Sequence, residues 1–319
     1  MDFYWWLLQE RFKAAPNLPE LITQGQFLRQ DDGKYWTAIQ CSDFNLLNKY
    51  LNNEQIEPIL IQRAIAGYNL LRVWTLFDIP GIGLCPSIDY NRIPDFVSLC
   101  AVYGLRVEFT AYTGINDPDH WDRLCQAALK CKPRPLLELV NELSENTNEP
   151  DSKGRIFELE RFKQAPAPLL SSHGSNGSER SPVTPHWSYA IMHYNDAYEW
   201  QRKVGHNSME IWNGPTLANE NTRYPDKTRN SQYAYDAAAG AALLCAGSCF
   251  HSVHGKSSEL WTAEELGFAK LWANGAKSVD LLCQEGRYVH PIDMEGTTYL
   301  RVYQRVLDNG RAFTVYINK

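Results

Sequence analysis

Apolar and polar residues alternate along the chain in a pattern that predicts strands and helices in regular succession. Short apolar runs typical of buried strands, such as NLLRVWTLF at residues 69–77, are separated by longer segments with helical spacing. The expected strands are residues 36–44, 69–77, 105–113, 135–142, 169–173, 187–195, 215–220 and 248–254. The expected helices are residues 53–66, 88–103, 120–130, 155–164, 197–204, 231–246 and 262–274.

This succession favours an α/β fold built from parallel strands. Strands that alternate with helices at this spacing imply βα units, and several are apolar on both faces, as helix-covered parallel strands are. Eight such units within 319 residues predict a (β/α)8 TIM barrel. A doubly wound open sheet is the alternative, but no GxGxxG sequence follows the first strand.

Both ends of the chain and one internal unit depart from the repeating pattern. A helix is expected at residues 2–14, a hairpin around Asp31-Asp32-Gly33, and a second hairpin at residues 298–318 around Asp-Asn-Gly. Residues 174–186 are rich in Gly, Ser and Pro, so we expect the fifth helix to be reduced to a turn. The expected organisation is a catalytic barrel over residues 1–280, with a C-terminal β-hairpin extension packed on it over residues 281–319.

Composition narrows the class of partner. The net charge is −6, from 31 basic and 37 acidic residues without basic clusters, which argues against nucleic acid. No apolar run approaches the roughly 20 residues of a membrane span, and no basic segment of a signal peptide precedes residues 3–8, so we expect no membrane partner and a cytoplasmic location unless a leader has been removed. The eight Cys form no CxxC pair or Cys/His ligand spacing, so neither a metal nor another cofactor is expected.

Two carboxylates stand at the ends of well-separated strands. The fourth expected strand ends in Asn141-Glu142 and the seventh in Asn219-Glu220. Reactive residues of such barrels lie at the carboxyl ends of strands, and glycoside hydrolysis needs a carboxyl pair across one cleft. Either Glu alone could be a salt-bridge partner or lie beside a helix cap; the pair in register is more specific.

Motifs in a particular order strengthen this interpretation. They are GQFLRQDDGKYW at 25–36, NLLRVW at 69–74, Asn141-Glu142, MHY at 192–194 and PTLANE at 215–220. In that order the chain resembles the clan A retaining glycoside hydrolases, which are built on the (β/α)8 barrel, over roughly residues 25–275. Each motif alone is weak; the order carries the resemblance.

The resemblance implies roles for the two glutamates. Glu142 would be the general acid/base, with a pKa raised by an apolar surround and by the nearby charge of Glu220. Glu220 would be the nucleophile and must stay ionised, which the positive charge of Arg72 would favour. The alternative for Arg72 is a structural ion pair in the barrel core.

The resemblance also implies residues around the sugar. Asn141 would contact the sugar 2-hydroxyl, Tyr194 would hydrogen-bond Glu220, and His193 could line the same subsite. The aromatic candidates for stacking on a sugar are Trp74, Tyr112, Trp187 and Trp261, each of which could instead pack in the core. His251 and His254 stand where the clan commonly has a Trp, and Trp261 is a candidate replacement.

The resulting hypothesis is retaining hydrolysis of a β-linked oligo- or polysaccharide, with the two carboxyl groups about 5–5.5 Å apart. Two alternatives stay open. A metal-dependent barrel hydrolase would use His173, His193, His251 or His254 with carboxylates, although no His-x-His lies in the first strand and no HExxH occurs. A catalytically degenerate barrel would act as a glycan-binding module.

Overall fold

The structure is a computed structural model in which part of the chain is described. The described residues are 17–25, 27–113, 115, 117–141, 164–172, 174, 187–193, 214–219, 222–225, 231–244, 247–280, 287–293, 300–306 and 312–318. The expected helices at 2–14, 155–164 and 197–204 and the expected turn at 174–186 lie outside these residues, apart from Gln164 and Gly174.

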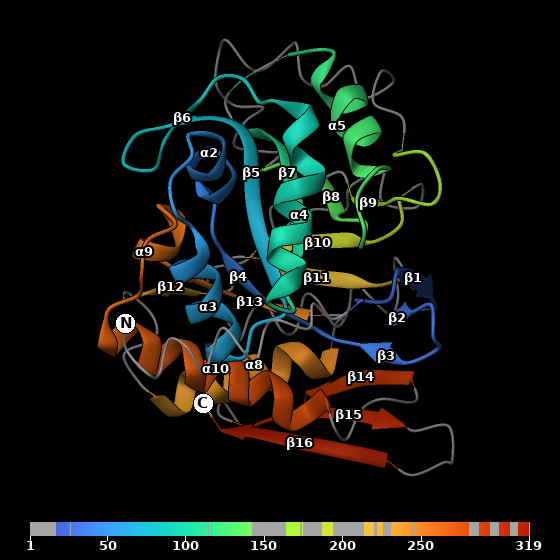
Figure 1. Cartoon of the computed structure of the whole chain (residues 1–319). Helices are drawn as coiled ribbons and strands as arrows, with labels where there is room; N and C mark the ends of the chain where they lie inside the picture. The colour runs from blue at the N-terminus through green and yellow to red at the C-terminus, as the bar shows by residue number, and fades with distance from the viewer. Residues whose placement is uncertain are drawn as a thin grey trace, which may run out of the picture.

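Eight parallel strands form a nearly closed barrel with helices on its outside (Figure 1). Their order around the barrel is β10-β11-β13-β4-β5-β7-β8-β9, and all seven neighbouring pairs are parallel. The predicted TIM barrel is therefore confirmed, and the open doubly wound sheet is excluded. The strands are β4 (Ala38–Ser42), β5 (Leu70–Ile79), β7 (Arg106–Thr113), β8 (Leu136–Val140), β9 (Leu170–Ser172), β10 (Ala190–His193), β11 (Thr216–Asn219) and β13 (Gly247–Ser252).

The seam between β9 and β10 is bridged by two serines. The carbonyl oxygen of Ser171 accepts a hydrogen bond from the Ser188 N–H at 2.9 Å, and the Ser188 hydroxyl accepts from the Ser171 N–H at 3.2 Å. Because Ser171 belongs to β9 and Ser188 lies two residues before the start of β10, these bonds connect the two ends of the barrel order.

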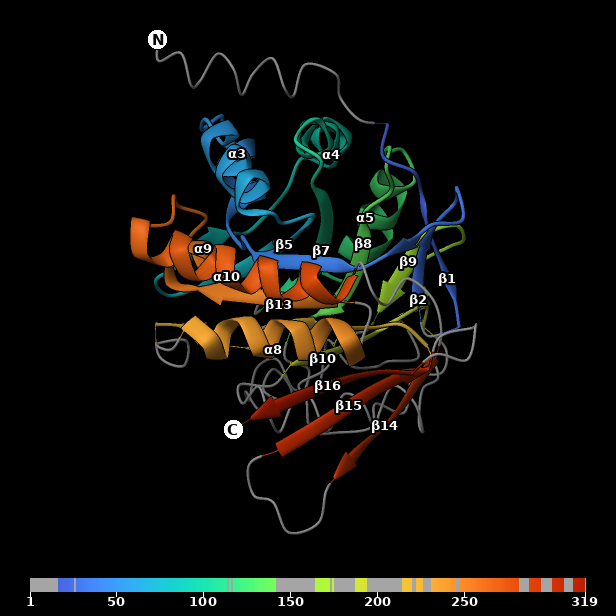
Figure 2. The same cartoon turned by 90° about the horizontal axis from the view of Figure 1, so that it is seen from below.

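Helices cover the outer face of the barrel. The described ones are α2 (Leu46–Leu51), α3 (Glu57–Ala66), α4 (Ile93–Val102), α5 (His120–Ala128), α8 (Ser231–Leu244), α9 (Val253–Lys256) and α10 (Ala263–Asp280), with a 3-10 turn at Tyr90–Arg92. Helix α3 has Pro58 in its first turn and ends at Gly67, whose φ of 101° is the left-handed conformation that suits a C-cap glycine. Figure 2 shows α8 and α10 side by side next to β13.

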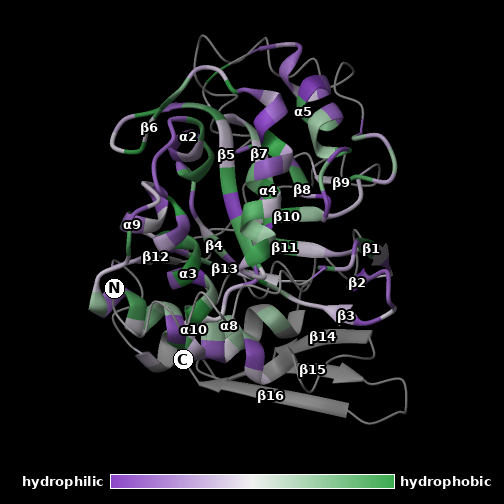
Figure 3. Cartoon of the chain, in the orientation of Figure 1, coloured by the Kyte–Doolittle hydropathy of each residue, from purple (hydrophilic) through white to green (hydrophobic). Residues whose placement is uncertain are grey.

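Alternation along the strands separates an outer core from the barrel interior. In β7, which is buried throughout, Val107, Phe109 and Ala111 belong to the large cluster shared with the helices. The intervening Glu108 and Thr110 are equally buried but polar, and they contact interior side chains. In Figure 3 much of the central strands is green, whereas purple residues are frequent on helices such as α5.

The amino ends of the barrel strands are closed by an apolar plug. An N-terminal sheet of β1 (Leu21–Gln24), β2 (Phe27–Gln30) and β3 (Tyr35–Trp36) confirms the hairpin expected near Asp31 and adds one strand to it. Leu21 and Leu28 from this sheet pack with barrel residues such as Leu70 and Leu136. The members of this cluster are Leu21, Leu28, Ala38, Leu70, Leu136, Tyr189, Ile191 and Leu217.

The C-terminal segment forms a second small sheet. The expected hairpin is present as β15 (Leu300–Val306) and β16 (Ala312–Asn318), and β14 (Arg287–Asp293) pairs with β15 to make three antiparallel strands. Strand β14 was not predicted. Both views place this sheet beside α8, which β15 and β16 contact. The division into units 1–280 and 281–319 stays a prediction.

A buried ion pair ties α3 to the end of β4. Arg63 donates from Nε to Asp43 Oδ2 at 3.0 Å and from Nη2 to Asp43 Oδ1 at 2.9 Å, and neither side chain is exposed. The guanidinium also donates to the Glu259 carbonyl and lies 3.7 Å from the centre of the Trp261 ring. This pair links α3, β4 and the segment before α10.

We expect Asp43→Asn to lower the free energy of unfolding by about 3–5 kcal/mol, because it leaves the buried Arg63 charge without its counterion. Chemical denaturation at neutral pH measures the loss. The matched control is Asp32→Asn on the exposed pair with Lys34, where the amide can keep the turn hydrogen bond and stability should change little. Equal losses in the two variants would contradict the role given to the buried pair.

Candidate active site

A layer of polar side chains from neighbouring strands lies inside the barrel, on the carboxyl side of the apolar plug. Strand register sets this layer, because Arg72 of β5 is level with Glu108 of β7, and Thr110 of β7 is level with Glu138 of β8. All four side chains are buried. The interior polar groups therefore reach one another across the sheet.

Arg72 is the positive charge of this layer. Its Nε donates to Glu138 Oε2 at 2.9 Å and its Nη2 to Glu138 Oε1 at 3.0 Å, which is a two-pronged contact. Nη2 also donates to the amide oxygen of Asn141 at 2.7 Å. The structure thus gives Arg72 the barrel-core ion pair that was its alternative role and, through Asn141, a direct contact with the end of β8.

Glu108 is a second carboxyl group in the same layer. It accepts hydrogen bonds from the Tyr189 hydroxyl at 2.7 Å and from the Gln40 side-chain amide. Burial, followed by the charge of Glu138, raises the pKa of Glu108 to about 7, and Arg72 only partly opposes this. One Arg therefore neutralises Glu138, while Glu108 holds its proton to near-neutral pH.

The predicted site residues stand at the carboxyl ends of three strands, β8, β10 and β11. Asn141, 5% exposed, directly follows β8 and continues its ladder by donating from its backbone N–H to the Tyr112 carbonyl at 3.0 Å. His193 and Asn219, the last residues of β10 and β11, are partners in register. Next along the chain come Glu142, Tyr194 and Glu220 respectively, which lie outside the described residues.

The tryptophans predicted to stack on sugar lie in the core. Trp74 is 4% exposed and stacks on Phe44 at a ring distance of 3.7 Å. Trp187 is 6% exposed and packs edge-on against Trp121 of α5. Trp261 is 4% exposed beneath Arg63. These three rings are thus largely buried among neighbouring side chains, which is the packing alternative, and their role as sugar platforms stays a prediction.

Tyr112, the fourth aromatic candidate, is also fully buried. Its hydroxyl donates to the backbone carbonyl of Asp117 at 2.8 Å and accepts a hydrogen bond from the backbone N–H of Trp121, which ties the loop after β7 to α5. It therefore has a packing role too.

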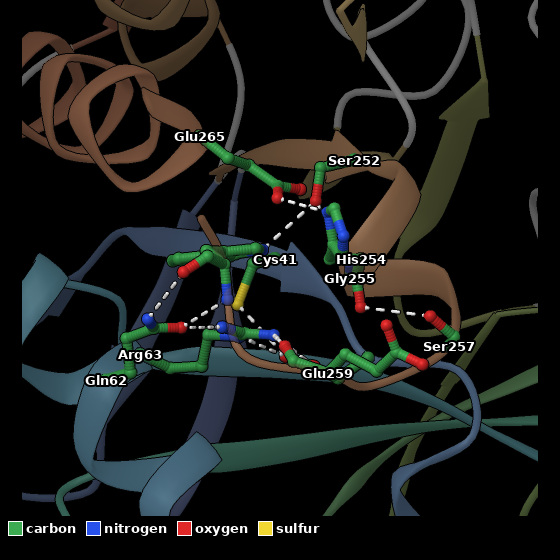
Figure 4. Close-up of polar contacts among 11 residues, drawn as sticks. Cys41, Gln62, Arg63, Ser252, His254, Gly255, Ser257, Glu259 and Glu265 are labelled. Carbon is green, nitrogen blue, oxygen red and sulfur yellow. Dashed lines mark hydrogen bonds and ion pairs between the residues drawn. The ribbon is translucent and has the colours of Figure 1, made fainter. Parts of the chain in front are cut away.

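His254 lies on the short helix that follows β13 (Figure 4). Its side chain is 38% exposed, and its Nδ1 lies 2.6 Å from Oε2 of the buried Glu265. A Cβ at Gly255 would come within 2.5 Å of the Ser42 carbonyl, so glycine lets this helix close onto the end of β4. His251, by contrast, is fully buried and bonds the Ser42 hydroxyl through Nδ1.

The described residues contain neither a cluster of metal-ligating side chains nor a helix suited to span a membrane. Among them, no three His, Cys, Asp or Glu side chains gather closely enough to hold a metal ion. Within the same part of the chain, no helix is both long and apolar enough to cross a bilayer.

Glu108 and Glu138 were not among the site residues expected from the sequence. Both stand at inward positions of strands that read as apolar runs, RVEFTAYT and LLELV. The sequence did contain a signal for these two residues. Each is a charged residue at an inward position of a strand that is buried on both faces. Arg72 in LLRVWTLF shows the same signal, although it was singled out through the resemblance of NLLRVW to the clan A motif.

No protein-family model matches the chain, and no curated protein matches it in sequence. Solved structures match its fold. A β-1,4-D-mannanase from Cryptopygus antarcticus has a TM-score of 0.53 at 14% identity over 80% of this chain and 94% of its own. An endo-1,4-β-mannanase from Rhizomucor miehei has a TM-score of 0.53 at 11% identity over 82% and 99%.

A structure with a different activity shares the same fold. The N-acetylneuraminic acid synthetase from Leptospira borgpetersenii has a TM-score of 0.50 at 10% identity over 83% of this chain and 91% of its own. The chain is thus a (β/α)8 barrel of the kind found in β-mannanases, and the resemblance stated from its sequence holds at the level of fold. Its activity has to be argued from its own residues.

The raised pKa of Glu108 makes a prediction about stability. Between about pH 4.5 and 7 the folded protein keeps a proton on Glu108 that the unfolded chain has released, so its free energy of unfolding falls as pH rises. Glu108→Gln removes this dependence. The stability of the wild type relative to the variant should therefore fall by roughly 1 kcal/mol per pH unit between pH 5 and 7 and level off above pH 8.

Urea denaturation of both proteins at four pH values measures this difference. The buried His120, whose pKa is lowered to about 4, contributes an opposite slope in both proteins and cancels. The groups that face Glu108 are Glu138, Arg72, Tyr189 and Gln40, and all four are unchanged in the variant. A difference that does not vary with pH would show that Glu108 is ionised in the folded protein.

Proposed function

We propose that this chain is a retaining glycoside hydrolase that cleaves a β-linked oligo- or polysaccharide by double displacement. The observation that carries the proposal is the contact between Arg72 and Asn141 at the carboxyl end of β8. It supports a polar site at that rim, and the next residue along the chain is Glu142. The shared fold of the β-mannanases is consistent with this chemistry and does not by itself imply it.

In the proposed reaction Glu142 is the acid/base and Glu220 the nucleophile. Glu142 protonates the oxygen of the leaving group while Glu220 attacks the anomeric carbon, and Glu142 then takes a proton from the water that releases the sugar. This requires β8 and β11 to deliver the two carboxyl groups about 5–5.5 Å apart. Asn141 would donate to the 2-hydroxyl, with His193 and Tyr194 beside it.

The substrate class is proposed from the structurally similar mannanases. Both mannanases named above act on β-1,4-linked mannan, so mannans and manno-oligosaccharides are the first substrates to test, followed by glucans, galactans and xylans. A screen of aryl β-glycosides and polysaccharides with detection of new reducing ends tests the proposal. Glycan binding without turnover on any of them would favour the binding-module alternative.

Glu220→Ala should abolish nearly all turnover, because no other group then forms the glycosyl-enzyme bond. Added azide should restore part of the activity by entering the vacated space as a nucleophile. Release of the aryl group, with and without azide, measures both effects. Glu54→Ala, at an exposed position that follows α2, is the control and should leave the rate unchanged. Full activity in Glu220→Ala would remove the nucleophile from the proposal.

Glu142→Gln should slow hydrolysis in proportion to the leaving group's need for a proton. We expect a loss of about 10²–10⁴-fold on substrates with poor leaving groups and a much smaller loss on dinitrophenyl glycosides. A series of aryl glycosides with different phenol pKa values measures the dependence. Equal losses across the series would contradict acid catalysis by Glu142, and an inverted product anomer by NMR would contradict the retaining mechanism.

A further inference from the structure

The Arg72 guanidinium connects the interior of the barrel to its rim. The carboxylate of Glu138, three residues before Asn141, binds one edge of the guanidinium through Nε and Nη2, and this Nη2 also reaches the Asn141 amide oxygen. Glu138 is 1% exposed and also accepts a hydrogen bond from the Thr110 hydroxyl at 2.5 Å. Strands β5, β7 and β8 thus all contribute to one contact.

This contact determines how the Asn141 amide is oriented. A guanidinium has only donors, so it can bind the amide through its oxygen and not through its nitrogen. With the oxygen turned toward Arg72, the NH2 group is the part of the amide that can serve a ligand. Such a group donates, and it suits a hydroxyl oxygen of a sugar.

The neighbouring carboxyl group of Glu108 does not share this task. Its partners are the Tyr189 hydroxyl and the Gln40 amide, and no hydrogen bond joins it to Arg72 or Asn141 among those of the described residues. The interior therefore contains two glutamates that are buried to a similar degree. Glu138 binds the guanidinium in two places, whereas Glu108 does not bind it. They form a natural pair of test and control.

We propose that Glu138 is a positioning residue: its carboxylate fixes the Arg72 guanidinium in the orientation that turns the Asn141 amide nitrogen toward the substrate 2-hydroxyl. Glu138 touches no reacting atom in this account, so it is distinct from the catalytic pair. The inference rests on the proposed function for its effect on the reaction. The orientation of the amide can be tested without any turnover.

The kinetic test compares an aryl β-glycoside with its 2-deoxy analogue. The wild type should prefer the parent by at least about 10-fold in kcat/KM, because the 2-hydroxyl contact strengthens in the transition state. Glu138→Gln keeps the shape but loses the charge, and Asn141→Ala removes the amide. Each variant should bring the ratio of kcat/KM for the parent to kcat/KM for the 2-deoxy substrate close to 1. Combining the two substitutions should lower this ratio little further. Glu108→Gln is the control and should keep the wild-type preference.

A purely structural role for Glu138 would give a different result. General loosening of the barrel would lower kcat/KM for the parent and the 2-deoxy substrate together and leave their ratio intact. That outcome, in a Glu138→Gln variant with native circular dichroism, would overturn the inference. If Glu138→Gln does not fold, Thr110→Val removes one hydrogen bond from Glu138 and keeps its charge. It should give an intermediate ratio, and an unchanged ratio would again contradict the inference.

A second measurement is independent of activity. The side-chain NH2 signals of Asn141 in a ¹H–¹⁵N spectrum are assigned by their loss in Asn141→Ala. They should shift in Glu138→Gln and stay in place in Glu108→Gln. If the wild type hydrolyses no glycoside but the signals behave in this way, the proposed function fails and the positioning role stands. If the wild type is active and the signals of Asn141 do not move in Glu138→Gln, the positioning role fails.

Discussion

A fully buried guanidinium inside the nearly closed barrel is the constraint around which the interior is arranged. A charge removed from water is tolerated only when it is paired and hydrogen-bonded, and Arg72 satisfies this through Glu138 and Asn141. Because both partners belong to β8 or follow it directly, the charge on β5 fixes the end of β8. The requirement to neutralise one Arg thereby constrains the end of β8 as far as Asn141.

The barrel interior changes character along the direction of its strands. Leu70 and Leu136 lie in the apolar plug, and two residues further along the same strands come Arg72 and Glu138. Inward positions recur every second residue, so each step of two moves from one layer to the next. The plug formed with the N-terminal sheet keeps the amino end apolar, and polarity increases toward the carboxyl end, where barrel enzymes hold their reactive groups.

The barrel could be predicted because its information is local. Strands apolar on both faces, separated by helical segments, specify βα units without knowledge of long-range contacts, and all eight strands lie where the pattern placed them. Strand β14 was missed because its polar RYVHPID sequence does not read as a strand. The candidate site was less predictable, since the pattern places Arg72 inside the barrel but does not say which carboxylate it meets.

The aromatic candidates for sugar stacking show the same limit. The side chain of a Trp near a strand end points either toward the rim or toward the helices. Moving the Trp by one position along the strand changes which of the two it faces. Trp187 turns toward Trp121 on α5, and Trp261 packs under Arg63, so both contribute to the outer core. Sequence position alone could not separate these outcomes, because they depend on which helix covers each strand.

The outer core and the polar interior are joined at the end of β4. Asp43 and Phe44 directly follow β4, and their side chains reach different partners. Asp43 binds Arg63 in the helix layer, while Phe44 stacks on Trp74 and lies 5.3 Å from the Arg72 guanidinium. The backbone bond from the Asp43 N–H to the Arg72 carbonyl closes the connection at 2.9 Å. An ion pair outside the barrel therefore restrains the aromatic wall against which the interior charge rests, and packing of the helices contributes to the geometry of the rim.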